Sequence, residues 1–562
     1  MEESLPSRFD VVCMGTGLPE TLIAAASSRS GLSLLHLDSS KYYGGEWASF
    51  TLHTLDEWKA ENEGRAEDGE GEKERYGKVS EGEIFRPIRR RSRISSIRDE
   101  WTEFSEEKAE GEERNWRQVV EDQARRFNID LTPKVLLAKG PMVQILCDAD
   151  ASKYAEFKLV DRLLAVSRIE IFRVPCSRSD IFDTEELSMV DKRRLVKFIQ
   201  NAMQFERDPD SVEAWKPFME GPLCSLLESS GVRDRLGSLV HHSLSVLCRP
   251  SSSALSTRPA LSALCRFLDS VGRFGPSPFL CPLYGAGDLP QCFARLAAVF
   301  GGIYYIGREI DGVVEKDGRV AAVVIGGQRV EVDNLVMNAA FLPEEWMAHV
   351  PFSSCRRIFR AVLITNGSIH RDDSKEHITL LNLAAGVEGV ECTTRLYEVG
   401  FEGCVAPKGL FLVHITTLAG ESAEGAVDNI IKRFYSQPSG PRVLRRLQFE
   451  QETDEGLEGE DERLLLSPSA PSNLVATPSP DSTIDYLSVL EQAQRAFLKL
   501  CPDRDFLPRK LASEEEKESE EDTEKDPEAE CERVISDSPL PSPSSPPIQD
   551  PHRKDSTRGS FQ

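Results

Sequence analysis

The sequence lacks several features that would assign it to a common class of protein. Its 562 residues contain no run of eighteen apolar residues, which excludes an ordinary membrane-spanning helix. The first residues, Met-Glu-Glu-Ser-Leu-Pro, have neither the charge nor the apolar stretch of a signal peptide, so we expect a cytosolic protein. The thirteen cysteines form no C-x-x-C pair and no zinc spacing, which indicates reduced thiols.

Recognisable catalytic chemistry is also scarce. The nine histidines are dispersed, and we find no P-loop, no convincing Ser-His-Asp order and no cluster of metal ligands. We therefore expect no metal site and no catalytic residues. The net charge of −25 argues against direct binding to nucleic acid or to an anionic membrane surface, because phosphate groups would be repelled.

Residues 9–38 have the pattern of a dinucleotide-binding unit: a strand, a glycine turn, a helix and a second strand that ends in Asp38. The turn is incomplete, because Gly15 and Gly17 are present while Glu20 occupies the place of the third glycine. A carboxylate in the first helical turn stabilises the helix, but it occupies the positive potential that would attract a phosphate. The pattern predicts a dinucleotide-binding fold without a bound cofactor.

The fold class that we expect is α/β, with a flavoprotein-like dinucleotide-binding fold, mixed sheets and a smaller, mainly helical domain. A hairpin is predicted over residues 312–324, around an Asp-Gly turn. Composition divides the chain into five segments: 1–55, the first part of the dinucleotide-binding domain; 56–114, a disordered charged insertion; 115–235, a mainly helical domain in which residues 154–176 return as strands to the sheet; 236–508, the remainder of the first domain; and 509–562, a disordered acidic and Ser/Pro-rich tail.

A glycine turn followed by Asp38 and then by Gly44-Gly45 is also compatible with a flavin-dependent oxidoreductase. In such an enzyme Asp38 would accept hydrogen bonds from a ribose, and Gly44-Gly45 would line the flavin. Glu20 argues against it. The residues around Gly44-Gly45, Tyr42-Tyr43 and Glu46, also differ from the basic residues expected of flavin amine oxidases.

Three longer motifs resemble the Rab GDP-dissociation inhibitor and Rab escort protein superfamily. They are Gly15-Thr16-Gly17-Leu18-Pro19-Glu20, Tyr42-Tyr43-Gly44-Gly45, and the segment 282–295, Pro-Leu-Tyr-Gly-Ala-Gly-Asp-Leu-Pro-Gln-Cys-Phe-Ala-Arg. Further segments are similar to the escort branch: 44–50, 126–131, 174–180 and 501–506. The resemblance covers roughly residues 8–55 and 115–508. The sequence departs from the family pattern at residues 476–482, where a more glycine-rich loop is expected.

The resemblance implies an accessory protein that is not itself an enzyme. Members of the escort branch bind GDP-bound Rab GTPases and present them to the alpha/beta heterodimer of Rab geranylgeranyltransferase. The resemblance further implies that they accompany the prenylated product, with its geranylgeranyl lipid, to a membrane, with only transient membrane contact. By motif, Tyr43, Asp288, Arg295 and Tyr305 fall on Rab-binding positions, and Phe182 and Arg193 fall on positions that contact the alpha subunit of the transferase. The superfamily implies no cofactor, and a Rab GDP-dissociation inhibitor is the nearest alternative.

Each of these residues also has an ordinary structural interpretation. Asp288 could cap the helix that follows it, with Gln291 completing a capping box. Arg295 could be a solvated surface arginine, and Phe182 could be buried as a hydrophobic staple. Tyr43 and Arg193 are of residue types that are common at binding hot spots.

Overall fold

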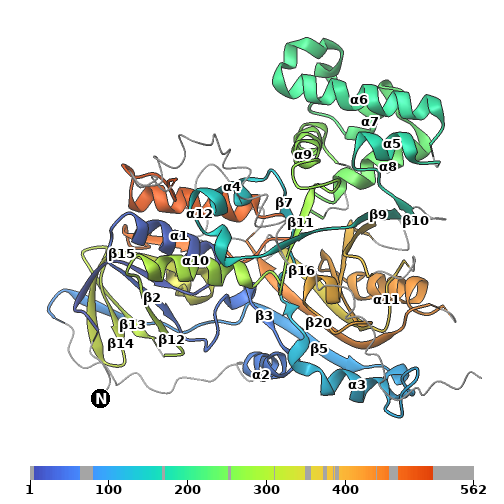
Figure 1. Ribbon diagram of the computed structural model, residues 1–562. Coiled ribbons are helices and arrows are strands. Elements are labelled where there is room, and N and C mark those ends of the chain that lie inside the picture. Colours follow the sequence, from blue (N-terminus) through green and yellow to red (C-terminus); the bar gives the residue numbers. More distant parts are fainter. Residues whose placement is uncertain are drawn as a thin grey trace, which may run out of the picture.

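The computed structural model describes residues 5–509, except for these gaps: 64–79, 167–170, 186, 251–254, 309, 348–355, 371–375, 384, 386–390, 438–439 and 455–465. Two large sheets lie side by side, and a group of helices stands beyond the second of them (Figure 1). The predicted α/β class, with mixed sheets and a smaller helical domain, is confirmed.

The first sheet contains the dinucleotide-binding unit. Its strand order is β12-β2-β1-β15-β14-β13-β4, and β21 pairs with β15. The strands are β1 (Arg8–Met14), β2 (Leu34–Asp38), β4 (Glu83–Pro87), β12 (Ile303–Ile306), β13 (Ile310–Lys316), β14 (Arg319–Ile325), β15 (Gln328–Asn338) and β21 (Leu474–Thr477). β13 and β14 form the predicted hairpin, in which Asp317 and Gly318 both have positive φ.

Four helices are associated with one apolar cluster beside this sheet: α1 (Leu18–Arg29), α4 (Pro141–Asp148), α10 (Asp288–Val299) and α12 (Leu487–Leu500). α1 packs against both α10 and α12. Figure 1 shows them together on the same side of the sheet. α10 packs into this cluster through Phe293, Leu296 and Ala297.

The second sheet is mostly antiparallel and has the order β10-β9-β17-β18-β19-β16-β20-β5. Its strands are β5 (Ile94–Trp101), β9 (Arg162–Val166), β10 (Ile171–Arg173), β16 (Arg356–Thr365), β17 (Thr379–Leu383), β18 (Thr394–Val399), β19 (Phe411–Leu418) and β20 (Val443–Thr453). The associated helices are α2 (Leu52–Glu63), α3 (Trp116–Asp122) and α11 (Ala423–Phe434). Two small sheets complete the body: β7 (Leu136–Leu137), β11 (Phe279–Pro282) and β8 (Phe157–Leu159) in one, and β3 (Ser49–Phe50) with β6 (Ile129–Asp130) in the other.

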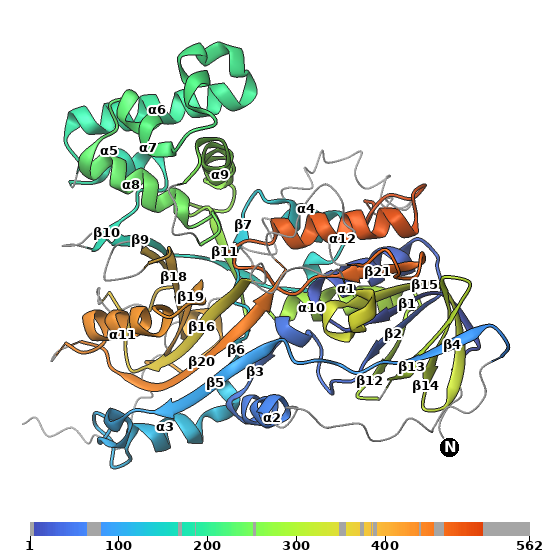
Figure 2. The same ribbon diagram turned by 180° about the vertical axis from the view of Figure 1, so that it is seen from behind.

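The helical domain begins after β10 and ends before β11. It contains α5 (Arg178–Asp183), α6 (Met189–Arg207), α7 (Leu223–Ser229), α8 (Asp234–Ser245) and α9 (Thr257–Ser270), with a 3-10 segment at Pro209–Phe218. These helices lie at the top of Figures 1 and 2, where α8 contacts β9 and β17 of the second sheet.

The structure corrects two of the expected segments. The charged segment 56–114 is not a disordered insertion in its described part, because β4 pairs with β13 in the first sheet and β5 pairs with β20 in the second. Strands at a sheet edge can be rich in charge, since only alternate side chains need to be buried and the backbone pairs with an existing neighbour.

The helical domain is also shifted relative to the expected range 115–235. Residues 115–176 mainly supply short helices and strands to the body, including β9 and β10, whereas α8 and α9 extend the helical domain to Ser270. Apolar stripes on helices do not reveal which neighbour they pack against. Of the expected tail 509–562, all residues after Arg509 lie outside the described part. Within the described residues, no helix combines the length and the apolar character needed to cross a membrane.

Candidate functional site

The glycine turn between β1 and α1 is closed by its own glutamate. Glu20 is fully buried, and its Oε1 accepts hydrogen bonds from Asn338 Nδ2 at 2.9 Å and from Thr477 Oγ1. The other carboxylate oxygen has no hydrogen-bond partner in the described structure and lies directly against Gly17. Burial raises the pKa of Glu20 to about 7, although both hydrogen bonds oppose the rise.

The residues around the turn do not fit a dinucleotide. In such a site, Gly17 would let the backbone approach a pyrophosphate, but the Glu20 carboxylate occupies that place. Asp38 is also engaged: it accepts from the backbone N–H of Thr16 at 2.9 Å, from the Thr16 hydroxyl at 2.7 Å and from the N–H of Ser40 at 2.8 Å. The remaining cavity is about 20 Å³, which is room for a water molecule.

Replacing Glu20 by Gln should flatten the pH dependence of stability. Because the pKa of Glu20 is raised by burial in the folded state, its contribution favours folding at low pH and is lost as the pH rises through about 7. Gln mimics the protonated acid and keeps the oxygen that accepts from Asn338 and Thr477. We expect the variant to exceed the wild type in unfolding free energy at pH 8 by an amount on the order of 3 kcal/mol.

Chemical denaturation at pH 5 and pH 8 measures this effect. The difference between variant and wild type should be small at pH 5. Equal stability of the two proteins at both pH values would show that the Glu20 carboxyl does not titrate in this range.

Three motifs of the sequence meet at one junction beside the turn. Asp130 of β6 accepts hydrogen bonds from the hydroxyl of Ser49 at 2.5 Å and from the N–H of Ala286 at 3.0 Å. The Ser49 oxygen also accepts from the N–H of Gly287 at 2.9 Å. Burial raises the pKa of Asp130 to about 6. The junction fixes the start of α10 against the segment that follows Tyr43.

α10 presents Asp288 and Arg295 to solvent on one face, because residues seven apart lie nearly in line along a helix. Asp288 is half-buried, and burial together with the charge of Glu156 raises its pKa to about 6. The exposed Arg295 places its guanidinium 4.7 Å from the ring centre of Tyr154. The capping interpretation of Asp288 is wrong, since Gly287 is the N-cap and no side-chain cap is formed.

Tyr43 and Tyr305 do not contact each other. The ring of Tyr43 lies 5.9 Å from that of Tyr304, which stacks on His36 at 4.8 Å. Tyr305, the next residue of the edge strand β12, points to the opposite face and lies under Arg308 at 5.5 Å. Sequence reasoning missed Tyr304 and Tyr154. The alternation along β12 could have indicated Tyr304, but nothing local marked Tyr154.

The helical domain exposes the other two expected residues at the junction of α5 and α6. Phe182 is 54% exposed, so a buried staple is the wrong interpretation. Met189 and Val190 at the start of α6 are 60% and 56% exposed. The exposed Arg193 follows one turn later, with no ion pair to another residue of the described chain. This apolar surface with one cation has the composition of a protein-binding hot spot.

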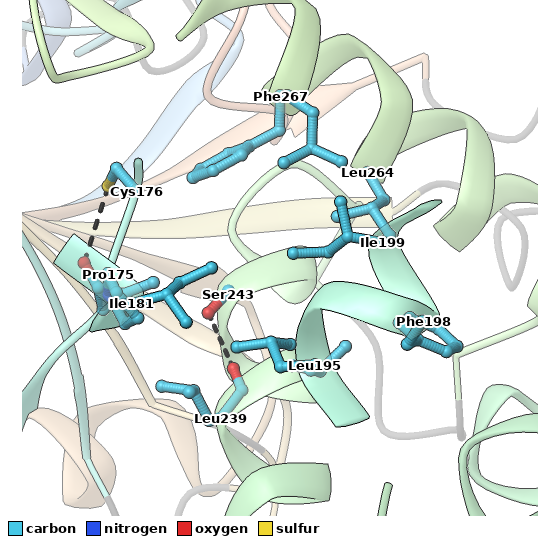
Figure 3. Close-up of a pocket in the computed structure, with 13 residues that line it drawn as sticks. Pro175, Cys176, Ile181, Leu195, Phe198, Ile199, Leu239, Ser243, Leu264 and Phe267 are labelled. Atoms are coloured by element: carbon cyan, nitrogen blue, oxygen red, sulfur yellow. Dashed lines mark hydrogen bonds between the residues drawn. The ribbon is translucent and has the colours of Figure 1, made fainter. Parts of the chain in front are cut away.

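An apolar pocket of about 50 Å³ lies between the helices of the same domain (Figure 3). Its side chains come from α5, α6, α8 and α9 and from the segment that leads into α5, and they include Ile181, Leu195, Ile199, Leu239, Leu264 and Phe267. The Ser243 hydroxyl faces it but donates to the Leu239 carbonyl at 2.6 Å. The Cys176 thiol donates to the Val174 carbonyl, and burial raises its pKa to about 12. The pocket therefore suits an apolar ligand and offers no activated nucleophile.

No group of three or more His, Cys, Asp or Glu side chains within the described ranges could hold a metal ion. The candidate site thus consists of two separate surfaces, one around α10 and one on the helical domain, together with the apolar pocket.

Comparisons with known proteins identify the family of the chain. The family model described as GDP dissociation inhibitor matches residues 1–78 and 96–431. A Caenorhabditis elegans protein named Rab proteins geranylgeranyltransferase component A 1 is 39% identical over 526 residues, which are 92% of this chain and 97% of the relative. A human protein of the same name is 29% identical over 90% of this chain and 93% of its own.

Among solved structures, a Rab GDI from Plasmodium falciparum superposes with a TM-score of 0.63 at 17% identity, covering 89% of this chain and 99% of its own. This likeness concerns the fold. Because the family model matches well over half of the chain, the protein belongs to the GDP dissociation inhibitor family.

Proposed function

We propose that the protein is a Rab escort protein, a non-catalytic component of Rab geranylgeranyltransferase that binds GDP-bound Rab and presents it for prenylation of its C-terminal cysteines. The observation that carries this proposal is the end-to-end similarity to proteins named as component A of that transferase, at up to 39% identity among those compared. The protein acts in the cytosol, and its contact with membranes is transient.

The Rab-binding surface in this proposal is the face around α10. Asp288 and Arg295 offer opposite charges along one helix face, and Tyr43 adds an aromatic ring in the loop that follows β2. Tyr305 contributes from the edge strand β12. Tyr and Arg are enriched at binding hot spots because they combine apolar area with directed hydrogen bonds.

The helical domain serves the transferase and the lipid. Phe182 and Arg193 contact the alpha subunit of the alpha/beta heterodimer, and the pocket of Figure 3 shelters the geranylgeranyl chain of prenylated Rab. A cavity of about 50 Å³ is much smaller than that chain, so its helices must separate when lipid enters.

The contribution of this chain to the reaction is positional. The zinc of the partner enzyme would activate the thiolate of a Rab cysteine. That thiolate displaces the leaving group of the lipid donor and forms a thioether. By holding the Rab body near that active site, this chain makes the encounter with the flexible Rab tail intramolecular and raises its effective concentration.

Reconstitution tests the proposal against its two alternatives. Purified transferase, Rab and lipid donor should yield more prenylated Rab with this chain than without it. An equal yield would refute the escort function and leave a Rab GDP-dissociation inhibitor. A flavin-dependent oxidoreductase would instead carry bound flavin, with absorbance near about 450 nm in the purified protein.

Replacing Arg295 by Ala should weaken Rab binding by about tenfold and leave transferase binding unchanged, since it removes a guanidinium from the Rab-facing side of α10. Titration calorimetry with GDP-bound Rab measures the loss. Arg295→Lys is the matched control, because it keeps the charge but loses the planar guanidinium. Its affinity for Rab should lie between the affinities of wild type and Arg295→Ala. Unaltered Rab affinity in Arg295→Ala would remove the residue from the surface.

A further inference from the structure

The segment Ile88–Arg93 crosses from the first sheet to the second, and we call it the strap. It begins after β4, the edge strand beside β13, and ends at β5, the edge strand beside β20. Figure 2 shows this run between the two sheets. Its backbone is fixed on both sides: the N–H of Arg91 donates to the carbonyl of Ala340 at 2.7 Å, and the carbonyl of Arg93 accepts from the N–H of Glu452 at 2.8 Å.

Arg90 of the strap enters the remnant of the dinucleotide pocket. It lines that cavity together with Asp38 and Glu46. Its Nη1 donates to the hydroxyl of Ser40 at 2.6 Å, and its charge interacts with Tyr42 and with both acids. The guanidinium thus lies against the loop that leads from Asp38 to Tyr43.

Arg93 makes a second charged contact at the same pocket. Its side chain is 4% exposed, and its Nη2 donates to Asp454 at 2.8 Å. The other oxygen of Asp454 accepts from the N–H of Ser479, next to Pro480 in the cavity wall. Glu46, which is also buried, is attracted to Arg93. Without the strap, these buried acids would lose their compensating charges, which is strongly destabilising.

We propose that the strap takes the place of the dinucleotide and closes the former cofactor pocket. In this arrangement Arg90 positions the loop Ser39–Tyr43 through its contact with Ser40. In a dinucleotide-binding fold the acid at the end of the second strand is normally satisfied by the ligand. Here Asp38 is satisfied by Thr16 and Ser40, and Ser40 is in turn held by Arg90. Arg90 is therefore a positioning residue for Tyr43. Its effect on Rab rests on the proposed function, whereas its effect on the loop does not.

Hydrogen exchange of the full-length protein tests the loop directly. Arg90→Met should accelerate amide exchange in peptides covering residues 38–45 by about tenfold, while peptides from α11 keep their rates. Arg91→Met is the matched control, because Arg91 is exposed and contributes only its backbone N–H. Arg90→Lys keeps the charge and should give an intermediate rate, so it tests the proposal even if Arg90→Met does not fold. The proposal is overturned if residues 38–45 exchange at the wild-type rate in Arg90→Lys. The same rate in a folded Arg90→Met variant would also overturn it.

Rab binding provides the second measurement. Arg90→Met should weaken Rab affinity by about tenfold, and adding Tyr43→Ala should cost little more, because both act through the same ring. Additive losses would show that Arg90 acts elsewhere. If wild type binds no Rab, the proposed function fails, and the exchange rates still decide the role of the strap.

Closure of the pocket is tested with FAD itself. Glu20→Gly restores the third glycine, yet it should bind no FAD while the strap remains in place. Stoichiometric FAD uptake by Glu20→Gly alone would show that the strap does not close the pocket.

Discussion

The double variant Phe182→Ala, Arg193→Ala is expected to bind the transferase about 100-fold more weakly than wild type while its Rab affinity stays unchanged. Phe182 is an exposed ring and Arg193 an exposed cation beside the apolar Met189 and Val190. A central aromatic anchor with a neighbouring arginine is the usual composition of a hot spot, where each truncation costs about 2 kcal/mol or more. Titration with the alpha/beta heterodimer, and separately with Rab, measures both affinities.

Arg194→Ala is the control for this prediction. Arg194 has the same charge and is also exposed, but it points about 100° away around α6 and pairs with Asp191 at 3.4 Å. It should leave both affinities intact. Equal losses of Rab and transferase binding in the double variant would indicate general damage to the helical domain, and the surface would then be misassigned.

Gly287→Ala is expected to lower both the stability of the protein and its affinity for Rab. A Cβ atom at this position would collide with the backbone nitrogen of Ser49, and its φ of −68° makes the effect purely steric. The start of α10 must then move away from the Ser49–Asp130 junction, at a cost of about 1–3 kcal/mol. Because Asp288 follows directly, we expect Rab affinity to fall by about tenfold.

Gly425→Ala is the matched control, because a Cβ atom there meets nothing within 4 Å. Gly425 lies inside α11, where alanine is favoured over glycine, so this variant should be slightly more stable than wild type. Thermal melts and Rab titrations of both variants measure the contrast. A Gly287→Ala protein with the wild-type melting temperature and Rab affinity would show that the junction does not position α10.

Some local features could be predicted because they depend on neighbours in sequence. The hairpin of β13 and β14 follows from an Asp-Gly turn between alternating apolar residues. The incomplete glycine turn follows from Glu20, which stands in the first turn of α1. The motif resemblance indicated the superfamily, which the family model confirms.

Other features depend on contacts that no local pattern contains. The basic cluster at 86–93 was interpreted as part of a disordered insertion, although Arg90 and Arg93 face buried acids from distant segments. Charge in a sequence does not show whether it is solvated or paired, because the partner of Arg93, Asp454, lies 361 positions away. The boundaries of the helical domain were misplaced for the same reason.

By itself, the sequence determined that a dinucleotide-type turn is present and that a carboxylate replaces its third glycine, since both are properties of adjacent residues. Only the tertiary structure decided where that carboxylate goes and what closes the pocket above it. Asn338 and Thr477 bind Glu20, and an arginine strap spans the two sheets, because long-range strand pairing brings these segments to the same pocket.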